Sequence, residues 1–160
     1  QHNTHIGDAR ATDMALEGML NTGELARTQH KVENVVLIGF GSYQGTVMAG
    51  NSWGSPMQGM QMPEARKGSW EYLLHQAGKE NKLLIMKEFS GNQKLMKNRI
   101  GHRAIGVVYN PLHEQYGNYV PTILPLRYDA FIYLDRTTAL HPLHLKPDGN
   151  QIPETYPFGV

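Results

Sequence analysis

Four short apolar segments constrain the fold of this 160-residue chain more than any other feature. Residues 35–40, 83–86 and 104–109 are nearly continuous apolar runs, and residues 128–135 alternate more between apolar and polar side chains. Continuous runs of this length are typical of strands that are buried on both faces of a sheet. Segments of helical character lie between some of them. The pattern therefore predicts an α/β fold with a mainly parallel sheet flanked by helices.

The segments between the expected strands predict helices and one long excursion. Residues 13–31 have helical spacing with Asp13 as a possible N-cap, and the Asn-Thr-Gly at 21–23 divides them into two short helices. A further helix is expected to begin after Ser69 and to stop at Gly78. Residues 41–68 are rich in Gly and Met and are expected to be irregular. In parallel sheets ligands bind beyond the carboxyl ends of strands, here after Phe40, Tyr109 and Leu134.

Composition narrows the classes of protein to which the chain can belong. Apolar residues make up 40% and charged residues 18%, as in globular proteins. The formal net charge of +1 gives no electrostatic reason to expect a nucleic-acid or membrane partner. The sequence has no Cys, which excludes a thiol nucleophile, a disulfide and a Cys-ligated zinc site within it. We expect one domain over residues 1–145, an irregular tail over 146–160 and a cytoplasmic location.

The first ten residues contain the densest group of chemically active side chains. His2 and His5, Asp8 and Arg10 lie among small and turn-forming residues. Neutral imidazole can take a proton from water near pH 7, and a second His or an Arg can stabilise an oxyanion. His2 and His5 are therefore the candidate catalytic residues of a hydrolase, with Asp8 and Arg10 in supporting or substrate-binding roles.

Two other interpretations of this segment stay open at the level of sequence. His2, His5 and Asp8 have a spacing that could serve a metal-dependent hydrolase, although Asn3 and Gly7 argue against a helix that would place both rings on one face. A small-molecule binding module without catalysis is the second alternative. We prefer a site without metal or cofactor.

Several weaker patterns favour ordinary structural roles. His141 and His144 repeat the spacing of the first pair, but Pro142 excludes a regular helix between them. His102 and Arg103, with Arg99, form a small basic cluster that we interpret as a solvated surface. The Met-rich stretch at 57–62 suits either an adaptable apolar ligand surface or a loop packed on the core.

Six stretches in order resemble the C-terminal half of an erythromycin esterase family domain. They are His-Asn-Thr-His-Ile-Gly-Asp-Ala-Arg at 2–10, Leu-Ile-Gly-Phe-Gly at 37–41, Gly-His-Arg-Ala-Ile-Gly-Val-Val-Tyr at 101–109, Asn-Tyr-Val-Pro at 118–121, Arg-Tyr-Asp-Ala-Phe-Ile-Tyr at 127–133 and His-Pro-Leu at 141–143. The resemblance implies a hydrolase that opens a lactone or other carboxylic ester, such as a macrolide, with an activated water. It implies no metal and no covalent serine intermediate.

The resemblance also implies where the site residues lie. His2 and His5 match the His-x-x-His pair that lines the family's active cleft. The family's principal general base, another His, and its glutamates belong to an N-terminal half that this sequence does not contain. We therefore expect the chain to be part of a larger hydrolase and inactive by itself, with a small-molecule ester as the partner of the intact protein.

Overall fold

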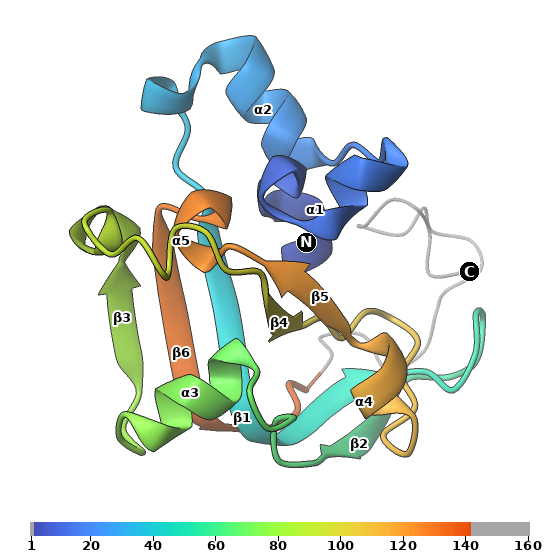
Figure 1. Cartoon of the computed structure of the whole chain (residues 1–160). Helices are drawn as coiled ribbons and strands as arrows, with labels where there is room; N and C mark the ends of the chain where they lie inside the picture. Colours follow the sequence, from blue (N-terminus) through green and yellow to red (C-terminus); the bar gives the residue numbers. More distant parts are fainter. Residues whose placement is uncertain (1, 142–160) are drawn as a thin grey trace.

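The computed structural model describes residues 2–141 and contains a four-stranded sheet in the order β2-β1-β6-β3 (Figure 1). The strands of this sheet are β1 (Ile38–Ala49), β2 (Gln58–Met62), β3 (Lys82–Ile85) and β6 (Ala130–Thr137). Only the central pair, β1 and β6, is parallel, whereas β2 and β3 run antiparallel to their neighbours. The expected mainly parallel sheet is therefore wrong, and the fold is α/β with a mixed sheet.

The Gly- and Met-rich segment explains much of this difference. β1 does not end near Phe40 but continues through residues 41–49, and the chain then returns as β2. The two strands form a long hairpin in which Ala49 pairs with Gln58. A hairpin return makes β2 antiparallel to β1, so the segment expected to be irregular supplies most of the longest strand and one edge of the sheet.

A second, two-stranded sheet pairs β4 (Ile100–Arg103) with β5 (Tyr119–Thr122) in antiparallel fashion. The expected strand at residues 104–109 is therefore wrong: the strand in this region, β4, ends at Arg103, just before that segment. Of that segment, only Val108 makes an isolated bridge, to Gly50. Two apolar residues of the segment, Ile105 and Tyr109, instead belong to a small cluster with Ala49 and Met60.

The helices are short, and side-chain caps mark the start of two of them, α2 and α3. Their bounds are α1 (Asn3–Ile6), α2 (Thr22–His30), α3 (Trp70–Gln76), α4 (Glu114–Gly117) and α5 (Leu124–Arg127), with 3-10 turns at Ala9–Ala11, Asp13–Glu17, Val32–Asn34 and Met86–Phe89. The division of residues 13–31 into two parts is confirmed, and the Asn21 side chain caps the second by accepting from the Glu24 amide. Ser69 caps α3 as expected, accepting from the Tyr72 amide.

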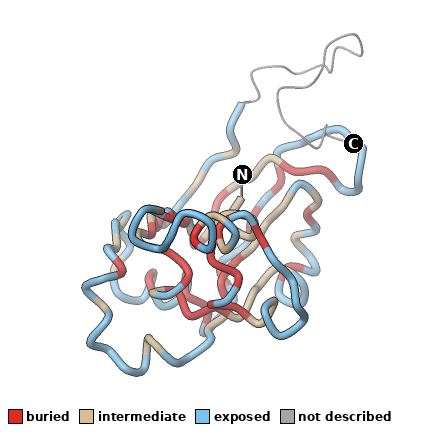
Figure 2. The backbone as a smooth tube through the Cα atoms, turned by 90° about the horizontal axis from the view of Figure 1, so that it is seen from above, coloured by how far each residue is buried: buried red, intermediate tan, exposed pale blue. Residues whose placement is uncertain are grey.

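One face of the four-stranded sheet is covered by α3, α5 and the β4–β5 pair (Figure 1). This covered face carries the main core, which includes Phe131 and Tyr133 from β6, both 0% exposed. Glycine in β1 makes room for the aromatic rings. A Cβ at Gly39 would lie 2.7 Å from the Tyr128 ring, and one at Gly41 would lie 2.5 Å from that of Phe131. Figure 2 shows the buried stretches gathered at the centre of the molecule.

The other face of the same sheet is open. Ile38 and Phe40 of β1 and Leu83 and Ile85 of β3 lie on it, with exposed fractions of 42%, 50%, 65% and 43%. The expectation that these strands are buried on both faces is wrong for this side, which we call the open face. Within residues 2–141, no helix combines the length and the apolar character needed to cross a bilayer.

Candidate active site

The segment that holds His2 and His5 forms one turn of helix, α1, which Gly7 ends. The sequence argument against a helix here is therefore wrong for this single turn. The two imidazole rings contact each other edge to face, with centroids 4.3 Å apart and planes 61° apart. His2 is half-buried and His5 is exposed. The structure thus brings the two candidate catalytic residues together at the surface.

The His2 ring is held in a defined orientation. Its Nδ1 is hydrogen-bonded to the Thr4 hydroxyl at 2.6 Å. Its Nε2 faces the backbone of Gly106, where an added Cβ would lie 3.7 Å away. Burial, followed by the charge of His5, lowers the pKa of His2 below that of a free imidazole. At neutral pH this ring is therefore uncharged and able to accept a proton.

Asp8 and Arg10, the other two candidate site residues, form an ion pair with each other. The Asp8 carboxylate accepts from Arg10 Nε at 2.9 Å and Nη2 at 2.7 Å, and from Arg27 Nη1 at 3.1 Å. Burial opposes ionisation of Asp8, but the hydrogen bonds from Arg10 and Arg27 outweigh it and lower the pKa of this carboxyl. Asp8 also caps the following turn by accepting from the Arg10 amide. The pair therefore fixes the loop that follows α1.

The side chains of the alternative metal site are not gathered around one point. Nowhere in residues 2–141 do three or more His, Asp or Glu side chains converge in a way that could hold an ion. Asp8, which would be the third ligand, directs its oxygens to two guanidinium groups instead. His141 is exposed, and its partner in the second His-x-x-His pattern, His144, lies outside the described residues.

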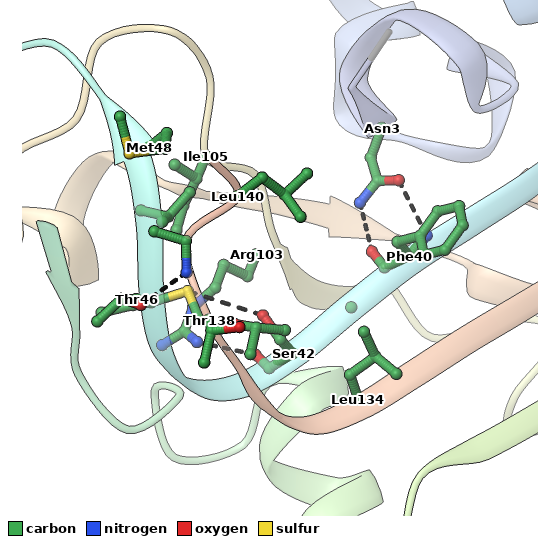
Figure 3. A pocket seen from close by; sticks show the side chains of 15 residues that line it. Asn3, Phe40, Ser42, Thr46, Met48, Arg103, Ile105, Leu134, Thr138 and Leu140 are labelled. Carbon is green, nitrogen blue, oxygen red and sulfur yellow. Dashed lines mark hydrogen bonds between the residues drawn. The ribbon is translucent and has the colours of Figure 1, made fainter. Parts of the chain in front are cut away.

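Asn3, between the two histidines, anchors α1 to the sheet. Its side-chain amide donates to the Phe40 carbonyl and accepts from the Phe40 amide at 3.0 Å (Figure 3). It thereby occupies the edge of β1 at a position where no strand of residues 2–141 pairs on that side. Its own carbonyl accepts from Arg127 Nη2 at 3.2 Å and from the Tyr128 hydroxyl at 3.4 Å.

A cavity of about 330 Å³ lies next to Asn3, between β1 and the segment that follows β6 (Figure 3). Its walls are mostly apolar, with several hydroxyl groups. The lining residues are Asn3, Phe40, Gly41, Ser42, Thr46, Val47, Met48, Met62, Arg103, Ile105, Leu134, Thr137, Thr138, Ala139 and Leu140. The positions after Phe40 and Leu134 that the sequence indicated are thus part of it, but the loop after Tyr109 is not. His2 and His5 are not among the lining residues.

Sequence reasoning missed a group of buried polar and charged residues. His102 and Arg103, interpreted as a solvated surface, are 0% and 4% exposed, so that interpretation is wrong. Arg103 donates to the carbonyls of Ser42, Tyr43 and Pro63, each at 2.8 Å, and pairs with Glu114. It therefore clamps β1 to the segment after β2. Nothing local to these two residues indicates which partners bury them, because Ser42, Tyr43, Pro63 and Glu114 come from other segments.

A model of a known protein family covers most of this chain. The model of the family described as "Erythromycin esterase" matches residues 1–137 of this chain.

Solved structures show the same fold at low sequence identity. A protein described as a succinoglycan biosynthesis protein has a TM-score of 0.66 and 20% identity over 91% of this chain and 33% of its own. A protein from Bacillus cereus has a TM-score of 0.64 and 16% identity over 86% of this chain and 32% of its own. The chain thus spans about a third of the length of these two structures. Because the family model matches far more than half of the chain, this protein belongs to the erythromycin esterase family.

Proposed function

We propose that this chain forms part of a hydrolase that opens a lactone or another carboxylic ester with water activated by His2. The observation that carries the proposal is the contact between a half-buried, neutral His2 and an exposed His5 beside an apolar cavity. Membership of the erythromycin esterase family supports the same reaction class.

In the proposed reaction, His2 accepts a proton from water while the water oxygen attacks the ester carbonyl carbon. His5 donates an N–H to the oxyanion of the tetrahedral intermediate. The intermediate collapses by breaking the bond to the alcohol oxygen, which takes the proton back from His2. The products are a carboxylic acid and an alcohol, which in a lactone belong to one molecule. Asp8 and Arg10 keep the loop after α1 in place.

The test uses the full polypeptide that carries this sequence and measures hydrolysis of a series of aryl esters and macrolide lactones. His2→Ala should lower turnover by about a hundredfold or more, because the proton acceptor is lost. His30→Ala, which removes an exposed imidazole of α2, is the matched control and should leave turnover unchanged. Near-normal turnover by a folded His2→Ala protein would refute the proposal. Exhaustive dialysis against a chelator, with turnover retained, would further exclude the metal-dependent alternative.

One observation favours a second candidate, a binding module without catalysis. The cavity is lined by Asn3 but by neither histidine, so a ligand can fill it without contacting either ring. In that case a macrolide should bind to the protein without being hydrolysed, and His2→Ala should leave its affinity unchanged.

A further inference from the structure

A fully buried Glu–His pair lies on the covered face of the four-stranded sheet and has no part in the proposed reaction. His102 Nδ1 donates to Glu71 Oε1 at 2.5 Å, and both side chains are 0% exposed. The amide of Arg103 donates to the same oxygen at 3.0 Å. Apolar residues of similar volume would often fill such a site at no loss of stability.

The polar contacts lead from the pair to the backbone of α1. His102 Nε2 lies 3.3 Å from the Tyr128 hydroxyl, which in turn lies 3.4 Å from the Asn3 carbonyl. Burial lowers the pKa of His102 even with the Glu71 carboxylate beside it, so the imidazole is neutral and its Nε2 is an acceptor. The single Tyr128 proton is therefore shared between His102 and Asn3, while Arg127 donates independently to the Asn3 carbonyl.

We propose that Glu71, His102 and Tyr128 are positioning residues that hold the Asn3 backbone and thereby set the orientation of the His2 and His5 rings. Glu71 orients the His102 ring, His102 orients the Tyr128 hydroxyl, and that hydroxyl meets the peptide between the two catalytic candidates. The effect on catalysis rests on the proposed function, but the effect on the His2 ring does not.

The molecule contains a comparable cluster that does not contact α1. His75 Nδ1 lies 2.6 Å from Asp135 Oδ1, and the Tyr133 hydroxyl donates to the same oxygen at 2.7 Å. Tyr133 is as buried as Tyr128, with exposed fractions of 0% and 1%. Tyr133→Phe is therefore a matched control for Tyr128→Phe, since each removes one buried phenolic hydroxyl next to a His–carboxylate pair.

The experiment follows the imidazole signals of histidine-labelled full polypeptide by NMR as a function of pH, with the His2 signal assigned by its loss in His2→Ala. Tyr128→Phe should raise the pKa of His2 by about 0.3 unit or more toward that of a free imidazole, because a looser α1 is better hydrated. Turnover should fall about tenfold in kcat with little change in KM, because binding does not use the ring orientation. Tyr133→Phe should change neither quantity.

The outcomes separate this proposal from the proposed function. A shifted His2 titration with no ester hydrolysis even by the unmodified protein would support positioning and refute the hydrolase. Identical His2 titrations in the two Phe variants would overturn the positioning role, whatever the turnover. If Tyr128→Phe does not fold, Glu71→Gln is compared with Asp135→Asn in the same way, and equal titrations again overturn the proposal.

Discussion

Both faces of the central sheet carry large apolar side chains, but those side chains are buried on the covered face and exposed on the open face. Phe131 on the covered face is 0% exposed, whereas Phe40 on the open face, one register position away on the neighbouring strand, is 50% exposed. On the covered face, β1 contributes glycine so that aromatic rings fit beneath it. On the open face it contributes large apolar side chains that nothing in residues 2–141 covers to the same degree. Apolar character alone thus does not reveal which side of a strand forms the core.

The largest difference in stability between the two faces is expected when Phe131 and Phe40 are each replaced by alanine. Phe131→Ala should lower the free energy of unfolding by about 3–5 kcal/mol, because it leaves a cavity among tightly packed rings. Phe40→Ala should lower it by roughly 1 kcal/mol or less, because half of that side chain already meets solvent. Chemical denaturation of both variants measures the difference, and equal losses would show that the open face is buried in solution.

A smaller effect is expected from adding a single methyl group to β1. In Gly39→Ala the new Cβ would lie 2.7 Å from the Tyr128 ring, so the ring must shift, at a cost of about 1–3 kcal/mol. Gly59→Ala in β2 is the matched control, since no atom lies within 4 Å of the added Cβ there. Thermal melts should therefore separate the two variants. A Gly39→Ala protein as stable as the Gly59→Ala protein would show that Tyr128 does not pack against β1.

The buried His102 makes the covered face sensitive to pH. Its pKa is lowered in the folded state by burial, so in acid the unfolded chain takes up a proton that the folded chain does not. Stability from this group is complete above the unfolded pKa of about 6.5 and falls as the pH drops below it, by at most about 1.4 kcal/mol per pH unit. His102→Gln should flatten this part of the stability curve, measured by denaturation between about pH 7 and pH 5. An unchanged slope in that variant would contradict the assignment.

A substitution on the open face, Leu83→Lys, should have the smallest effect on stability but a clear effect on self-association. Leu83 is 65% exposed on the edge strand β3, so Leu83→Lys should change the free energy of unfolding by about 0.5 kcal/mol or less. An exposed apolar edge promotes self-association, and a lysine there opposes it. We therefore expect a polypeptide of these 160 residues to form oligomers on sizing, and Leu83→Lys to shift it toward monomer. A monomer without the substitution would refute this expectation.

Particular residues show which features of the fold and the candidate site could be predicted from the sequence. Local signals were sufficient for the Ser69 cap, the break near Asn21 and the family membership carried by the motifs. They failed for residues 41–49, where glycine indicates a loop although Gly41 is required by the Phe131 ring, which approaches from a distant segment. The burial of His102 and Arg103 could not be predicted for the same reason. Their partners, Glu71 and Glu114, come from other elements. The roles assigned to His2 and His5 stay a prediction.

The parallel pairing of β1 with β6 has a consequence for how the chain reaches its fold. The hydrogen bond between the Leu37 amide and Asp129, at the start of that pairing, joins residues 92 positions apart. A loop of this length carries a substantial closure entropy, so the centre of the sheet should form slowly and late. During synthesis β3 has no partner in this sheet until β6 emerges, since β6 is the only strand with which it pairs within the described residues. The backbone of β3 therefore stays unpaired while residues 86–129 are synthesised, and chaperone capture of nascent chains should concentrate on that interval.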